Sequence, residues 1–181
     1  MLMLDLFAGL GGASQAMRER GWDVVTVEIN PEFQPDIVAD LCTWSWDGPR
    51  PDLIWASPPC TEFAREFMPW SKTGKSPDMT LVMAALRIVS EAQPRFWVLE
   101  NVRGAIRWFK PVLGAPRAIV GPFHLWGFFP ELGRVDTSSW RKKESLPSSA
   151  RAQRAKIPYE LSLAMAMACE RQATLSLPEC S

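Results

Sequence analysis

The chain has 181 residues, of which 47% are hydrophobic and 22% charged, and this composition is typical of a single globular domain. Its 20 Lys and Arg residues balance its 20 Asp and Glu residues, so the overall charge does not indicate a general nucleic-acid binder. The four cysteines form no C-x-x-C pair and there is one histidine, which argues against a metal site and favours a reducing, cytoplasmic compartment.

The chain begins with an apolar run over 1–7 that Asp5 interrupts. This pattern predicts a first strand rather than a secretory signal, and no later run is long enough to cross a bilayer. A glycine-rich turn and a predicted helix over 13–20 follow. Glycines let a backbone approach a ligand closely and a helix N-terminus has unpaired N–H groups, so this arrangement suits a nucleotide-like ligand. The turn has the spacing G-x-G-G rather than the dinucleotide fingerprint, so a simple tight turn is the alternative.

Acidic residues end the next two predicted strands. The second strand ends at Glu28, roughly 20 residues after the glycines, where a carboxylate can accept both hydroxyls of a ribose. The third, over 37–41, carries Asp40, which could accept the exocyclic amine of adenine, while Ile29 and Leu41 sandwich the ring. Solvated acids at strand ends are the alternative. The pattern predicts a nucleoside site, and it lacks a P-loop that would hold phosphates.

The fourth predicted strand, over 52–55, leads into Pro58 and Pro59. Each proline ring fixes φ and removes a backbone donor, so the strand must end there. Cys60 is then held on a stiff turn at the carboxyl end of a strand, where ligands bind in open α/β sheets. A thiol in this position is a candidate nucleophile, and a merely buried small side chain is the alternative. The loop over 61–78 that follows is long enough for a functional lid.

A helix over 80–92 and a fifth strand over 95–99 come next, and Glu100 follows this strand. A carboxylate after four apolar residues is poorly solvated, so we expect its pKa to be raised; a Glu that caps a neighbouring element is the alternative. Two short antiparallel strands, over 118–120 and 123–126, are expected to complete the sheet. These elements predict an α/β fold, with a mostly parallel sheet flanked by helices and an antiparallel edge strand.

The region over 133–156 is polar and locally basic in a neutral protein. Its cationic residues, among them Arg141, Lys142 and Lys143, could contact nucleic-acid phosphates. A solvated loop is equally consistent with this pattern. A final helix is expected over 158–169.

Several of these motifs occur in the order that is found in one enzyme family. They are Asp5-Leu6-Phe7-Ala8-Gly9-Leu10-Gly11-Gly12, Glu28, Asp40, Pro58-Pro59-Cys60, Glu100-Asn101-Val102 and Ile157-Pro158-Tyr159-Glu160-Leu161. The set resembles the DNA (cytosine-5) methyltransferases, and compact phage-encoded members look most similar. The resemblance covers residues 1–104 and, more weakly, 157–169. The Pro-Cys and Glu-Asn-Val motifs are its most specific part.

The resemblance implies a Rossmann-like class I methyltransferase fold and S-adenosyl-L-methionine as the cofactor. It also implies that Cys60 adds to C6 of a cytosine that has left the DNA duplex, while Glu100 protonates N3 and the methyl group goes to C5. The cofactor pocket is expected to be lined by Asp5, Phe7, Ala8, Gly9, Leu10, Gly11, Gly12, Glu28, Ile29, Asp40, Leu41 and Pro59.

The sequence departs from the family pattern at two motifs. Thr61 stands where the family usually has Gln after the cysteine. The Gln-x-Arg-x-Arg element that should follow Glu-Asn-Val is not recognisable, and Arg103, Arg107 or Arg117 would have to replace it at the nucleic acid.

The separate target-recognition region of the family has no counterpart of comparable length. We expect one catalytic domain over 1–172, with the basic loop over 133–156 in place of that region, and a flexible tail over 173–181. The expected partner is double-stranded DNA with a flipped cytosine, recognised with relaxed specificity or with help from a second protein; neither a membrane nor a metal is expected. An RNA or nucleotide cytosine-5 methyltransferase and an inactive cofactor-binding subunit are the alternatives. A phage-encoded protein would act in the host cytoplasm.

Overall fold

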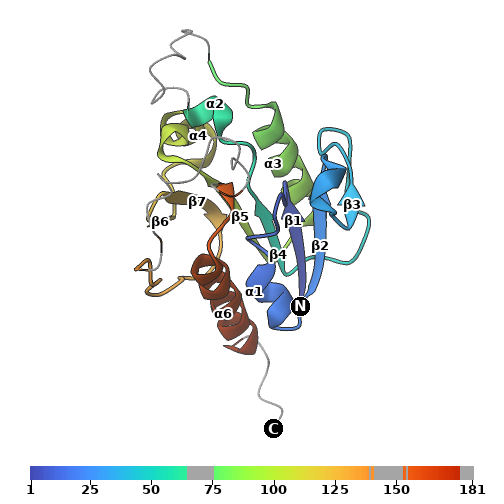
Figure 1. Ribbon diagram of the computed structural model, residues 1–181, viewed down its shortest axis with the longest axis vertical. Helices are drawn as coiled ribbons and strands as arrows, with labels where there is room; N and C mark the ends of the chain where they lie inside the picture. The colour runs from blue at the N-terminus through green and yellow to red at the C-terminus, as the bar shows by residue number, and fades with distance from the viewer. Residues whose placement is uncertain (65–75, 139, 141–152, 154, 176–181) are drawn as a thin grey trace.

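A seven-stranded sheet forms the centre of the computed structural model, which describes residues 1–64, 76–138, 140, 153 and 155–175 (Figure 1). The strand order is β3-β2-β1-β4-β5-β7-β6, and β7 is antiparallel to both of its neighbours while the other pairs are parallel. The predicted α/β class with an antiparallel edge is therefore confirmed. The strands are β1 (Leu2–Leu6), β2 (Asp23–Glu28), β3 (Ile37–Val38), β4 (Leu53–Ala56), β5 (Phe96–Asn101), β6 (Ala118–Val120) and β7 (Phe123–Phe128).

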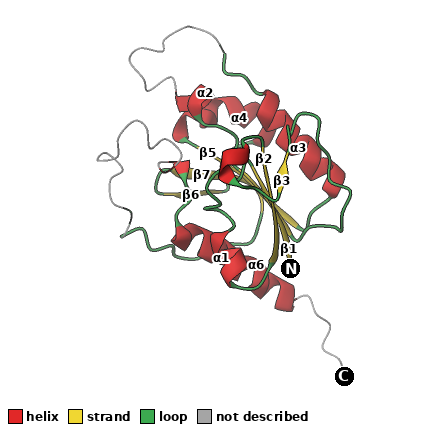
Figure 2. Cartoon of the chain, turned by 45° about the vertical axis from the view of Figure 1, so that its right-hand side comes forward, coloured by secondary structure: helices red, strands yellow, loops and turns green. Residues whose placement is uncertain are grey.

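Helices cover both faces of the sheet, as Figure 2 shows. One face carries α1 (Gln15–Glu19) and α6 (Tyr159–Leu175), and the other carries α2 (Thr61–Ala64), α3 (Thr80–Ala92) and α4 (Ile106–Leu113). Two short 3₁₀ helices, η1 (Pro31–Phe33) and η3 (Arg103–Ala105), lie in the connections. Because both faces are covered, all four residues of β4 are buried, as is usual for parallel strands. In the described part of the chain, every helix is too short or too polar to cross a lipid bilayer.

Several elements differ from those predicted. Helix α6 continues to Leu175, beyond the predicted end at 169 and into the predicted tail over 173–181. The fifth strand continues through Glu100 to Asn101, because both residues pair with β7, opposite Leu125 and His124. The third strand is only two residues long, since its pairing with β2 ends at Val38. Helix α4 was not predicted, and it contains a proline that interrupts the usual helical pattern.

The end of the described chain packs against the glycine turn near its beginning. The Oγ of Ser162 in α6 donates a hydrogen bond to the Ala13 carbonyl (2.5 Å) and accepts one from the Ala16 N–H (3.2 Å). A Cβ on Gly12 would lie 2.6 Å from the Ile157 carbonyl oxygen, so only glycine allows this approach. The segment before α6 is therefore held against the loop that joins β1 to α1.

Replacing Ser162 by Ala should lower the free energy of unfolding by about 1–3 kcal/mol, because two buried backbone groups lose their partner. Urea denaturation monitored by tryptophan fluorescence measures this change. The control is Ser90→Ala, an exposed position in α3, which should leave stability nearly unchanged. Equal stabilities of the two variants would contradict the role given to the Ser162 hydroxyl.

Candidate active site

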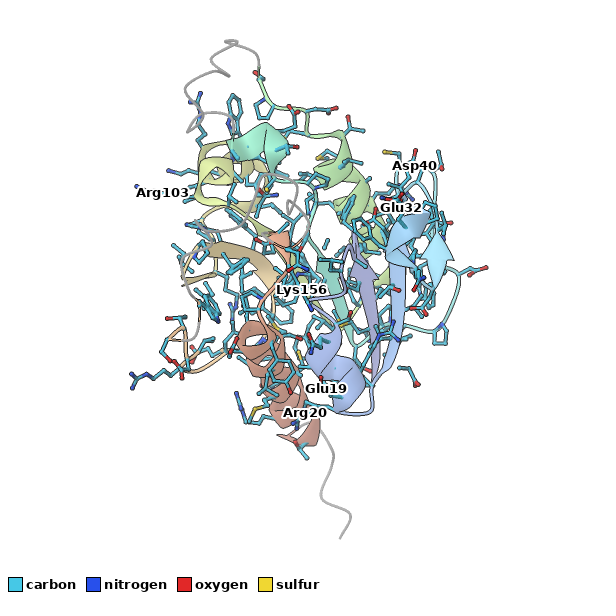
Figure 3. The ribbon with its side chains drawn as sticks, in the orientation of Figure 1. Glu19, Arg20, Glu32, Asp40, Arg103 and Lys156 are labelled. Atoms are coloured by element: carbon cyan, nitrogen blue, oxygen red, sulfur yellow. The ribbon has the colours of Figure 1, made fainter. Side chains whose placement is uncertain are left out.

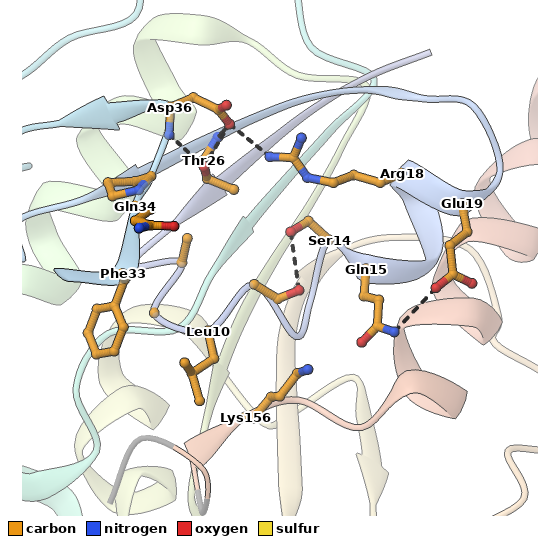
Figure 4. Close-up of a pocket in the computed structure, with 14 residues that line it drawn as sticks. Leu10, Ser14, Gln15, Arg18, Glu19, Thr26, Phe33, Gln34, Asp36 and Lys156 are labelled. Atoms are coloured by element: carbon orange, nitrogen blue, oxygen red, sulfur yellow. Dashed lines mark hydrogen bonds and ion pairs between the residues drawn. The ribbon is translucent and has the colours of Figure 1, made fainter. Parts of the chain in front are cut away.

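The carboxyl ends of β1, β2 and β4 surround a cavity of about 560 Å³. Both Cys60 and the acids that follow the early strands line it, so the sulfur and these carboxyl groups share one space. Every residue predicted to bind the cofactor lines this cavity except Gly11, which lines an adjoining, more open cavity of about 690 Å³ (Figure 4). The described lining residues are Asp5, Phe7, Ala8, Gly9, Leu10, Gly12, Ala13, Glu28, Ile29, Phe33, Ala39, Asp40, Leu41, Ser57, Pro59, Cys60, Thr61, Leu81, Ala155, Lys156 and Ile157.

The carboxylate of Glu28 joins the end of β2 to the glycine turn. Its Oε2 accepts from the Gly9 N–H at 3.1 Å, and its Oε1 accepts from the N–H groups of Ile29 (2.9 Å) and Asn30 (3.1 Å). The turn needs this support because Phe7, a non-glycine residue, has φ +60°. Each carboxylate oxygen has two lone pairs, so Glu28 retains capacity for a hydroxyl donor at the cavity.

Asp40 lines the cavity together with two apolar side chains, Ile29 and Leu41. The Oδ1 of Asp40 accepts from the Cys42 N–H at 2.9 Å, which holds the carboxylate in a tight turn after β3. Leu41 is buried in the core, whereas Ile29 is 64% exposed at the cavity wall. An aromatic ring between these two side chains would cover the exposed face of Ile29, which fits the predicted place of adenine.

Asp5 is the most deeply buried acid of the cavity. Its side chain is 1% exposed, and Oδ2 has no hydrogen-bond partner. Burial raises the pKa of this carboxyl group to about 7, and hydrogen bonds from Ser14 offset the effect only in part. A buried acceptor of this kind suits a ligand that brings a donor or a positive charge.

The turn that carries Cys60 is fixed from both sides. The Asn101 side chain donates from Nδ2 to the Pro58 carbonyl at 3.0 Å, and Asn101 itself is 1% exposed. On the other side, the Cys60 carbonyl accepts from the N–H groups of Phe63 (3.1 Å) and Ala64 (2.8 Å), which starts α2. The thiol is partly exposed to the cavity from this rigid support.

Glu100 is not among the cavity-lining residues. It is 8% exposed within β5, next to Asn101, whose side chain contacts the Pro58 carbonyl. The structure therefore brings Cys60 together with the predicted cofactor residues and places Glu100 in the neighbouring strand. Among the described residues, no group of three or more His, Cys, Asp or Glu side chains is arranged to hold a metal ion.

The predicted nucleic-acid residues are only partly within the described chain. Arg103 is exposed in η3, on the opposite side of the view in Figure 3 from Asp40. The guanidinium of Arg107 lies over the Trp108 ring at 4.4 Å. Arg141, Lys142 and Lys143 lie outside the described residues, as does most of the predicted lid.

Sequence reasoning missed several residues of the cavity wall, chiefly Phe33, Leu81, Lys156 and Ile157. Lys156 was counted only as part of a basic loop. The short motif that begins at Ile157 was the one signal that could have indicated that this segment reaches the cavity.

Comparison with known proteins places the chain among methyltransferases. A model of the C-5 cytosine-specific DNA methylase family matches residues 1–108. A Frog virus 3 protein named "Probable DNA (cytosine-5)-methyltransferase" is 29% identical over 56% of this chain and 53% of its own length. The type II methyltransferase M.AquIA of Picosynechococcus is 28% identical over 60% of this chain and 51% of its own. The chain spans about half the length of these curated relatives. The solved structure of the Entamoeba histolytica methyltransferase EhMeth aligns with 74% of this chain and 54% of its own, with 16% identity and a TM-score of 0.48.

The buried carboxyl group of Asp5 should make stability depend on pH. Because its pKa is about 7 in the folded chain and near 3.8 ordinarily, the folded state binds a proton more tightly than the unfolded state. The protonated carboxyl group of Asp5 therefore stabilises the folded state, and this stabilisation is complete at acidic pH and is lost as pH rises through 7. Between pH 5 and pH 8 it should remove about 2–3 kcal/mol from the free energy of unfolding.

Urea denaturation of the wild type and of Asp5→Asn at these two pH values tests the prediction. Asp5→Asn should abolish this part of the pH dependence. The difference in the free energy of unfolding, variant minus wild type, should therefore be more positive at pH 8 than at pH 5. The exposed Asp47→Asn is the control and should keep the wild-type slope. Parallel curves for wild type and Asp5→Asn would show that Asp5 does not titrate in this range.

Proposed function

The chain belongs to the C-5 cytosine-specific DNA methylase family, and on that premise we propose that it methylates C5 of cytosine in DNA with S-adenosylmethionine as the methyl donor. One observation carries the proposal: Cys60 and the acids Asp5, Glu28 and Asp40 line a single cavity at the carboxyl edge of the sheet. The candidate nucleophile and the acids proposed to bind a nucleoside thus share one cavity, which supports a transfer between two bound molecules.

The cavity residues fit an adenosine ligand with a positive charge. Oε2 of Glu28 has one lone pair left for a ribose hydroxyl, Asp40 can accept the adenine amine, and Ile29 and Leu41 offer apolar surface to the ring. The unpartnered Oδ2 of Asp5 provides a further acceptor. S-adenosylmethionine, when bound, supplies an electrophilic methyl group.

Cys60 would supply the nucleophile, because C5 of cytosine is too weak a nucleophile to react unaided. The Cys60 thiolate forms a bond to C6 of a flipped cytosine, and Glu100 gives its proton to N3, so that the electron pair moves to C5. After C5 has taken the methyl group, it loses its proton, with water as the simplest base. The bond between Cys60 and C6 then breaks, and Glu100 recovers the proton from N3.

We further propose that residues 1–172 act as one catalytic domain. The contacts of Ser162 with Ala13 and Ala16 support this, since they make α6 part of the same packed unit as the glycine turn. The basic loop over 133–156 and the exposed Arg103 would contact DNA in place of a target-recognition region, alone or with a recognition partner.

Transfer of a labelled methyl group to mixed-sequence duplex DNA tests the activity. Wild type should label DNA, and Cys60→Ala should lower the rate by at least about a thousandfold, because the nucleophile is lost. Cys42→Ser is the matched control, since Cys42 is exposed and lies outside the cavity lining, and it should keep wild-type activity.

The same assay separates the alternatives. Labelling of RNA or free cytidine nucleotides but not DNA would assign the activity to another cytosine substrate. No labelling of any substrate, with intact binding of the methyl donor, would favour an inactive cofactor-binding subunit. Equal labelling by wild type and Cys60→Ala would contradict the covalent route.

DNA binding should depend on the basic loop. Replacing Arg141, Lys142 and Lys143 together by Gln should reduce the slope of log affinity against log salt by about 2–3, since each phosphate contact releases counterions. Fluorescence anisotropy with a labelled duplex at several salt concentrations measures the slope. An unchanged slope would show that these three residues make no phosphate contacts.

A further inference from the structure

Lys156 lies where the two cavities meet. It lines both the 560 Å³ cavity that contains Cys60 and the adjoining 690 Å³ cavity, in which Figure 4 draws it with Leu10 and Gln15. The glycine turn forms the other part of this boundary, since Ala8, Gly9 and Leu10 also line both spaces. Figure 3 shows Lys156 near the centre of the view.

Packing against the glycine turn determines where the stem of this lysine lies. A Cβ on Gly12 would lie 2.7 Å from Lys156 Cγ and 2.7 Å from the Ile157 N, so the stem rests on a surface that only glycine leaves open. The hydrogen bonds of Ser162 hold the following helix to the same turn. The close contacts of the fold therefore place the start of the Lys156 side chain, as far as Cγ, at the glycine turn, and the exposed residue lines both cavities.

The charges around the main cavity are very unequal. Asp5, Glu28 and Asp40 are acidic, and among the described residues that line the cavity Lys156 is the one with a cationic side chain. The turn has fewer backbone donors available than its glycines suggest. The Gly9 N–H is bonded to Glu28 at 3.1 Å, and the Gly11 N–H is bonded to the Ala8 carbonyl at 2.8 Å.

These charges matter for the amino-acid end of an adenosyl donor, which carries an ammonium group and a carboxylate. Glu28 and Asp40 disfavour the carboxylate by like-charge repulsion, and Asp5 does the same whenever it is ionised. We propose that Lys156 binds the carboxylate of the methionyl group, and so selects adenosyl ligands that carry an intact amino-acid end. This inference rests on the proposed function.

Isothermal titration calorimetry with two adenosine thioethers tests the proposal without any turnover. S-adenosylhomocysteine carries the amino-acid end, and 5′-methylthioadenosine has the same adenine, ribose and thioether without it. Lys156→Gln should weaken S-adenosylhomocysteine binding about tenfold, the value expected for loss of one charge-assisted hydrogen bond, and leave 5′-methylthioadenosine binding unchanged. Lys156→Arg should restore most of the affinity for S-adenosylhomocysteine. The exposed Lys110→Gln in α4 is the control for removal of a positive charge elsewhere.

The possible results separate this proposal from the wider one. If Lys156→Gln weakens both ligands equally, or leaves S-adenosylhomocysteine binding unchanged, the role of Lys156 is wrong while the proposed function stands. If wild type binds neither ligand, both proposals fail. A loss in Lys110→Gln as large as that in Lys156→Gln would also overturn the assignment, because the effect would then be one of net charge.

Discussion

The carboxylate of Glu28 is the interaction on which the rest of the site depends. It accepts three backbone N–H groups, one from the glycine turn after β1 and two from the end of β2. Backbone donors bonded to a carboxylate are among the stronger hydrogen bonds in proteins, and removing the acceptor would leave these N–H groups without their partner. A structural acid at a strand end and a ligand-binding acid are therefore not exclusive interpretations, because Glu28 lines the cavity and its Oε2 keeps one lone pair while the carboxylate holds the turn.

Two further contacts bring distant parts of the chain to this edge of the sheet. Asn101 reaches from β5 to the Pro58 carbonyl and fixes the turn before Cys60, while Ser162 reaches from α6 to the loop before α1. Both side chains are almost fully buried, so their hydrogen bonds compete little with water. Most of the candidate site residues, including Cys60, thus lie in turns that buried hydrogen bonds tie to β5 and α6, which favours accurate positioning of reacting groups.

Local patterns were sufficient to predict much of this arrangement. The apolar runs, the glycine turn and the two prolines act within a few residues, so the strand ends at Glu28 and before Cys60 followed from the sequence. The extension of β5 through Glu100 did not, because it depends on pairing with a strand more than twenty residues later. Helix α4 was missed because Pro111 lies inside it. The place of Lys156 depends on a contact with Gly12, and no local pattern encodes a contact between the two ends of the chain.

The electrostatics of the cavity link the position of Asp5 to what the cavity can accept. Burial raises the pKa of Asp5 to about 7, and the nearby negative charge of Glu28 acts in the same direction. The carboxyl group is therefore close to half protonated at neutral pH, in a space that Glu28 and Asp40 also line. A positive charge bound beside Asp5 would favour its ionised form and lower its pKa, whereas a neutral ligand would leave the proton in place. Binding of a cationic nucleoside should consequently release protons near neutral pH. A cavity of this kind therefore distinguishes ligands by charge as well as by shape.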